Sequence, residues 1–162
     1  MPEPLPEPLP EPARAAFAYA IVRVVPRVER GERLNAGIVL LCRPRRFLGA
    51  EMRLDEARLQ SLDPACDVDE VRAHLDLVRR IAAGDSSAGP IAALSQAERF
   101  HWLVAPSSTV IQPSAVHAGL SADPAATLEH LLRTLVAGPT TTDRPPAAVE
   151  SRPPPTGKET NR

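Results

Sequence analysis

Residues 26–42 read P-R-V-E-R-G-E-R-L-N-A-G-I-V-L-L-C, a charged segment that runs directly into an apolar one. The apolar part, 34–42, has the composition of a buried strand, and we expect its even-numbered residues on one face and its odd-numbered residues on the other. Arg30, Glu32 and Asn35 lie at the entry to this strand. An unpaired polar side chain is costly to bury, so these three residues form either a structural latch or a site.

Two further segments join this strand in a predicted sheet. Residues 17–25 are apolar on both faces except at Arg23, and Pro26 ends them. They should pair antiparallel with 34–42 across the loop 26–33. Residues 47–54 alternate strictly between apolar and polar positions, which predicts a half-exposed third strand. A short β-branched stretch at 109–112 predicts a fourth strand.

Helix signals separate the third and fourth predicted strands. A short helix is expected at 55–62. A longer one should run from Asp67, which with Glu70 resembles a capping box, to about residue 83. One or two helical turns are expected at 95–102. A last helix should begin at Asp123 and end near 136. The sequence therefore predicts an α+β domain: a mostly antiparallel sheet of about four strands, in the order β-β-β-α-α-β-α, with helices packed on it.

The 19 prolines divide the chain into three parts. Residues 1–13 repeat P-E-P-L and form a Pro/Glu-rich tail, residues 14–138 form a single domain, and residues 139–162 form a second Pro-rich tail. Closely spaced prolines forbid a helix and favour extended structure, so both tails should be disordered. The P-x-x-P spacing also offers a ligand for a proline-binding domain, although a plain linker is the simpler interpretation.

Several classes of protein are disfavoured by what the sequence lacks. The longest apolar run, 15–22, is too short for a membrane span, and no charged leader precedes an apolar stretch, so we expect a soluble cytoplasmic protein. Cys42 and Cys66 form no C-x-x-C pair, and no histidines have metal-ligand spacing. Phosphate-binding, dinucleotide and serine-nucleophile motifs are absent, so we expect no cofactor or metal.

Charge is uneven along a chain whose net charge is −1. Residues 14–53 hold nine arginines and three glutamates, whereas residues 54–85 hold four arginines and eight acids. The basic segment could meet nucleic acid, phosphate or an acidic partner, but the acidic helices beside it could equally neutralise it. We favour internal neutralisation and do not expect nucleic-acid binding.

A second group of candidate residues lies further along the chain. Phe100 and Trp102 are two apart on a predicted helix, so one should enter the core and the other should cover a surface. Arg99 precedes them, and Gln112 and His117 follow in a segment rich in serine and threonine. His117 is expected on a loop with polar neighbours.

Four motifs together resemble the bacterial domain-of-unknown-function 3037 family: F-A-Y-A-I-V-R-V-V-P, R-G-E-R-L-N-A-G-I-V-L-L-C, R-F-H-W-L and S-T-V-I-Q-P-S-A-V-H-A-G-L. The resemblance covers about residues 17–136. It implies that the positions matching the family signature are Arg30, Gly31, Glu32, Asn35, Gly37, Arg99, Phe100, Gln112 and His117. Relatives often carry arginine where this chain has Ser107, and the family is associated with HipA-like kinase domains, which implies a kinase-like partner.

Two hypotheses about function follow. The first is a protein-interaction or regulatory module without catalytic activity. It binds a partner, in particular a HipA-like kinase, through the basic hairpin within residues 14–53 and its tip. The second is an enzyme or ligand-binding domain for a phosphorylated or nucleotide-like anion, with Arg30 and Arg99 as clamps and Glu32 or His117 as acid–base groups. It requires Arg30 and His117 to converge.

Overall fold

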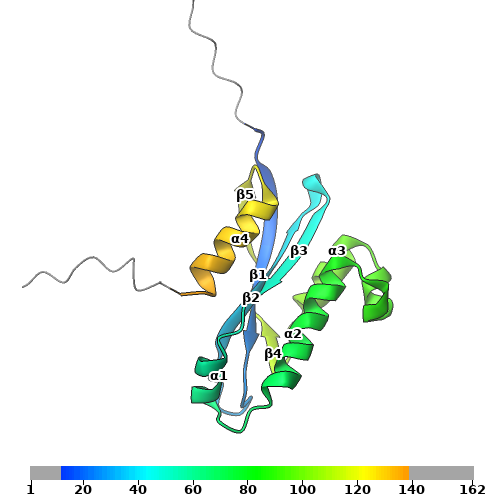
Figure 1. Ribbon diagram of the computed structural model, residues 1–162. Coiled ribbons are helices and arrows are strands. Elements are labelled where there is room, and N and C mark those ends of the chain that lie inside the picture. The colour runs from blue at the N-terminus through cyan, green and yellow to red at the C-terminus, as the bar shows by residue number, and fades with distance from the viewer. Residues whose placement is uncertain (1–11, 139–162) are drawn as a thin grey trace, which may run out of the picture.

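An antiparallel sheet organises the computed structural model, which describes residues 12–138 (Figure 1). Its strands are β1 (Ala15–Val24), β2 (Leu34–Cys42), β3 (Phe47–Met52), β4 (Ile111–Pro113) and β5 (His117–Ser121). The helices are α1 (Glu56–Leu62), α2 (Val68–Ala83), α3 (Gln96–Leu103) and α4 (Pro124–Leu135), with short 3₁₀ turns η1 (Arg43–Arg45), η2 (Ser86–Ala88) and η3 (Pro90–Ala93). The predicted tails fall outside the described residues, except for Pro12 and Ala13.

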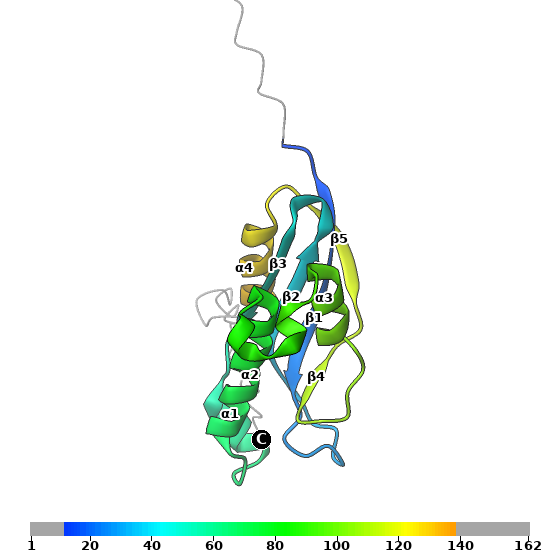
Figure 2. The ribbon, with the colours of Figure 1, turned by 90° about the vertical axis from the view of Figure 1, so that its right-hand side faces the viewer.

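The sheet has the order β3-β2-β1, and β4 and β5 both pair with the far edge of β1. Every pairing is antiparallel. Figure 2 shows β5 and β4 one after the other along that edge. The α+β class is confirmed. Strand β5 was not predicted, because His117 was expected on a loop. Helix α3 is a full element of two turns.

Helix boundaries follow the capping signals. The Asp67 carboxylate accepts hydrogen bonds from the N–H groups of Asp69 and Glu70, and Asp123 does the same for the first turn of α4. Gly84 ends α2 with a positive φ of 73°, a conformation that glycine adopts without steric cost. The third and fourth strands differ by two residues or fewer from the predicted bounds at their ends.

Helices cover both faces of the sheet (Figure 1). On one face, α2 packs over β3 and α3 packs over β2 and β3, and Leu75, Ile81 and Phe100 are buried there. On the opposite face α4 packs over β2 and β3 and buries Leu128 and Leu132. The sheet is therefore the middle layer of three.

A bulge in β2 changes which residues face which layer. The pairing of β1 with β2 passes from Val22 opposite Gly37 to Arg23 opposite Asn35, so that Ala36 is the extra residue. Leu34 and Ala36 consequently share the α2 face with the odd-numbered residues Val39 and Leu41. The expected single alternation along 34–42 is therefore wrong. Gly37 lies at this bulge because a Cβ there would meet the backbone oxygen of Glu51 at 2.8 Å.

The break between β4 and β5 is closed by the side chain of Ser114. Its hydroxyl oxygen accepts a hydrogen bond of 2.8 Å from the Ile21 N–H, and its own N–H donates to the Ile21 carbonyl. Ser114 is buried. A side chain thus replaces a missing backbone partner at the edge of β1.

We expect Ser114→Ala to lower the free energy of unfolding by about 1–3 kcal/mol, because the Ile21 N–H is left without an acceptor. The matched control is Ser108→Ala, which alters an exposed serine of the preceding loop and should change stability by less than about 0.5 kcal/mol. Urea denaturation of both variants measures the difference. Equal stability of the two variants would contradict the bridging role of Ser114.

Candidate functional site

Arg30 and Glu32 bond to each other in the loop between β1 and β2. The Arg30 Nε–H and one Nη–H both donate to a single Glu32 carboxylate oxygen, the former at 2.8 Å. The two side chains are 58% and 41% exposed. An exposed ion pair contributes only about 0–1 kcal/mol to stability. The pair shapes the loop locally, and within residues 12–138 neither side chain forms a hydrogen bond to the sheet.

The contact that fastens this loop to the domain is made by Arg27 instead. Its Nη2 donates to an Asp63 carboxylate oxygen at 3.1 Å, across the end of α1. The Asp63 side chain is only 10% exposed and also accepts the Ala65 N–H. The hydrogen bond from Arg27 lowers the pKa of the Asp63 carboxyl; partial burial opposes this shift and the Ala65 N–H reinforces it.

Asn35 and Arg99 each bind the carboxyl end of a helix. The Asn35 amide donates to the Leu135 carbonyl at 3.0 Å, at the end of α4. The Arg99 guanidinium donates to the Ala82 carbonyl near the end of α2 and to the Leu94 carbonyl. Donors at such positions satisfy carbonyls that have no partner within the helix. Both side chains hold helices in place.

Gln112 and His117 lie on the strands beyond β1. Gln112 is opposite Arg23, and its amide donates to the Thr109 carbonyl at 2.9 Å. His117 is opposite Tyr19, and the two rings are 5.2 Å apart between centroids.

The six candidate residues do not meet in one place. Tyr19, the partner of His117, is five residues from the end of β1, which is about 16 Å along a strand, and Arg30 lies in the loop beyond that end. Arg99 belongs to α3, which packs on the α2 face of the sheet, whereas Tyr19 packs in the core under α4. The structure therefore brings together only Arg30 and Glu32 among them.

Trp102 borders an apolar groove between α2, α3 and β4. Phe100 is buried and Trp102 is 50% exposed, as expected for two aromatic residues that point in different directions. The groove encloses about 480 Å³ and is lined mainly by apolar side chains, among them Leu77 and Val110.

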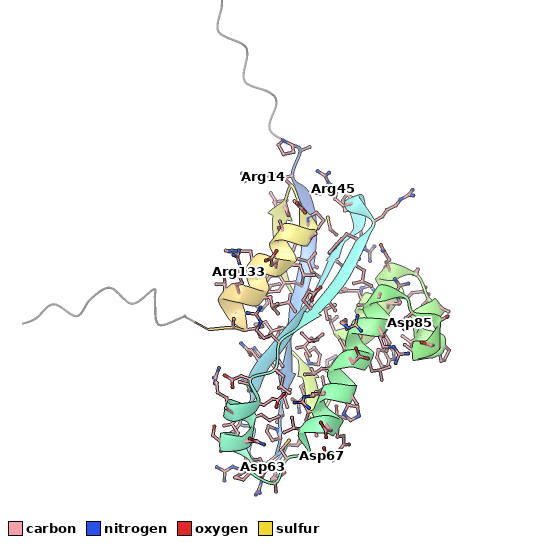
Figure 3. All side chains as sticks on the ribbon, in the orientation of Figure 1. Arg14, Arg45, Asp63, Asp67, Asp85 and Arg133 are labelled. Carbon is pink, nitrogen blue, oxygen red and sulfur yellow. The ribbon has the colours of Figure 1, made fainter. Side chains whose placement is uncertain are left out.

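Four exposed arginines gather at the end of the sheet opposite the Arg27–Asp63 pair: Arg14, Arg43, Arg45 and Arg46, here called the arginine cluster. The last three belong to the turn from β2 to β3, and Arg45 donates to the Ala13 carbonyl beside Arg14. Figure 3 shows Arg14 and Arg45 at one end of the domain and Asp63 at the other. None of the four forms an ion pair with any residue in 12–138.

The arginine cluster was not among the candidate site residues expected from the sequence. The available signal was the run R-P-R-R at 43–46, which has no acid within four residues on either side. Arg14 joins them because β1 contacts η1 and Arg45 donates to the Ala13 carbonyl. These contacts depend on the pairing of β1 with β2, which the sequence pattern alone does not give.

The chain belongs to the family described as protein of unknown function (DUF3037), which it matches over residues 19–136. This confirms the resemblance. No curated protein and no solved structure matches the chain. Over the described residues, no helix has the length and hydrophobicity to cross a membrane, and no three potential metal ligands lie together. The family description names no activity.

We expect Asp63→Asn to lower the melting temperature at neutral pH more than the matched change Glu32→Gln, because Asp63 is nearly buried and Glu32 is not. The pKa of Asp63 is lower in the folded chain than in the unfolded chain, so the stability it contributes is present above about pH 4. That contribution is lost as the pH falls through the folded pKa. Thermal melts at neutral and acidic pH should therefore differ less for Asp63→Asn than for the wild type. Equal losses in melting temperature for Asp63→Asn and Glu32→Gln would contradict the conclusion that Asp63 fastens the loop.

Proposed function

We propose that this protein is a cytoplasmic protein-interaction module that binds an acidic surface of a partner protein through the arginine cluster. The observation that carries the proposal is the set of four exposed guanidinium groups at one end of the sheet, without a carboxylate partner in residues 12–138. Guanidinium groups bind carboxylates through two parallel hydrogen bonds and are common at protein interfaces.

Five arginines elsewhere in residues 12–138 make the contrast. Arg27, Arg30, Arg72, Arg79 and Arg80 each form an ion pair with an aspartate or glutamate. Of the nine arginines in 14–53, only Arg27 and Arg30 are paired in this way, and only Arg27 reaches the acidic helices. Internal neutralisation therefore leaves the arginine cluster available to a partner.

A kinase-like protein is the partner that we propose first, and regulation of that partner is the role. This choice comes from the family resemblance. The arginine cluster defines the surface that such a partner must have: several carboxylates at a spacing that matches the arginines. Attraction between these opposite charges should also speed association. Unpaired thiols at Cys42 and Cys66 are compatible with a reducing compartment.

We do not propose the alternative of an anion-binding enzyme. It requires Arg30, Arg99 and His117 to act on one ligand, and these side chains already bind Glu32, two carbonyls and the Tyr19 ring respectively. Nucleic acid is another polyanion that could meet the arginine cluster. The experiment below separates it from a protein partner.

Reversal of charge in the double variant Arg45→Glu, Arg46→Glu should weaken binding of the partner by at least about tenfold, because attraction becomes repulsion at the interface. Full-length tagged protein is used to capture the partner from the native host after nuclease treatment. Calorimetry with the purified partner then measures the dissociation constant at low and high salt.

The matched control is Arg33→Glu, Arg58→Glu, which changes the total charge equally at exposed positions of the opposite end. This control should bind as the wild type does. Wild-type affinity of the Arg45, Arg46 variant, or loss of all capture after nuclease treatment, would contradict the proposal.

A further inference from the structure

The outer edge of β3 carries backbone groups without a strand partner. Antiparallel pairing alternates, and the Arg53 N–H donates to the Ala36 carbonyl, so Phe47, Gly49 and Glu51 also direct their N–H and C=O groups toward β2. The intervening residues, Leu48, Ala50 and Met52, therefore direct theirs away from the sheet. Within the described residues, β3 pairs with no strand other than β2.

Two helices turn this edge into a groove. The groove encloses about 590 Å³ and is lined by β3, by Arg79 and Ala83 of α2 on one face of the sheet, and by Ala125 and Leu128 of α4 on the other. Helices on both faces of the sheet leave between them a slot as thick as the sheet layer, which is one strand. A strand edge without protection can pair with a strand of another chain. The two helices lie on either side of the β3 edge and leave the edge itself accessible.

Small side chains keep the slot open. Ala83 and Ala125 are exposed at its two walls, and Ala50 lies at its floor. Gly49 lets α4 pack closely on β3, since a Cβ there would meet Leu128 Cδ2 at 2.9 Å. At these three positions the small side chains leave room for the extended backbone of a peptide beside β3.

Charge identifies which peptide fits. The groove begins at Phe47, the residue after Arg46, so the arginine cluster stands at one mouth of the groove. A strand that pairs antiparallel with β3 runs from Met52 toward Phe47, and its carboxyl-terminal end arrives at Arg43, Arg45 and Arg46. Acidic residues at that end complement the arginine cluster.

We propose that the partner's contacting segment is an extended, proline-free peptide with an acidic carboxyl-terminal end, which adds to β3 as a sixth, antiparallel strand. This inference rests on the proposed function and names the part of the partner that is recognised. Backbone hydrogen bonds to Leu48, Ala50 and Met52 hold the peptide, and its alternate side chains meet α2 and α4.

The groove beside Trp102 does not define an occupant in the same way. Its nearest strand, β4, has three residues and ends in Pro113, which has no N–H to donate. Its lining is mainly apolar and contains no aspartate, glutamate, lysine or arginine. Neither backbone pairing nor charge complementarity selects a partner there.

The test uses the full-length protein and a fluorescein-labelled synthetic peptide of alternating serine and valine residues followed by two aspartates. Fluorescence anisotropy measures its dissociation constant. Binding should weaken by at least about tenfold when prolines replace the central residues, because the pairing N–H groups are lost, and also when the aspartates move to the amino terminus. A peptide that binds equally in all three forms, or not at all, overturns the inference.

Matched variants locate the peptide on the protein. Ala125→Trp fills the groove from α4, whereas Ala126→Trp places the same side chain at an exposed neighbouring position that does not line it. Only the first should lose at least about tenfold in affinity, as expected when a side chain occludes a packed contact. Ala83→Trp, with Ala73→Trp as its control, repeats the comparison from α2.

The outcomes separate this inference from the proposed function. Loss of binding in Arg45→Glu, Arg46→Glu together with wild-type binding in both groove variants overturns strand addition and leaves the arginine cluster as the site. Conversely, the proposed function is overturned if Ala125→Trp and Ala83→Trp both lose binding while Arg45→Glu, Arg46→Glu binds as the wild type does. A dimer in light scattering that Ala125→Trp dissociates assigns the groove to a second copy of the chain and also overturns the inference.

Discussion

Burial of both faces of β2 is the constraint on which the rest of the structure depends. Apart from Asn35, every residue of this strand is buried, so helices must cover it on both faces. The hairpin partner β3 lies between the same two helix layers but at the edge of the sheet, where α2 and α4 extend beside it. The groove along β3 is thus a consequence of covering β2.

The turn between β2 and β3 links this groove to the basic end of the domain. Three arginines of the arginine cluster belong to the turn, and the strand edge begins directly after them. At the opposite end Arg27 pairs with Asp63, and this pair fastens the first loop. The ion pair that fastens the loop is therefore separated in space from the arginine cluster.

Local patterns were sufficient for much of the fold and for little of the site. Alternation and capping residues predicted β1 to β3, α2 and α4, because those signals depend on neighbours in sequence. The exposed strand β5 was missed, since A-G within it weakens the strand signal and its pairing with β1 depends on residues far apart in the chain. The bulge at Ala36 likewise depends on the partner strand. Arg30 and Glu32 bond to each other, but the latch that fastens the loop to the domain joins Arg27 to Asp63, 36 residues away.

Amide hydrogen exchange of the free full-length protein, followed by NMR, tests most directly whether the edge of β3 is open to a partner. The account predicts slow exchange at Gly49 and Glu51, whose N–H groups pair with β2, and fast exchange at Leu48, Ala50 and Met52. Slow exchange at all five amides would contradict it, because the edge would then already be covered in the free protein.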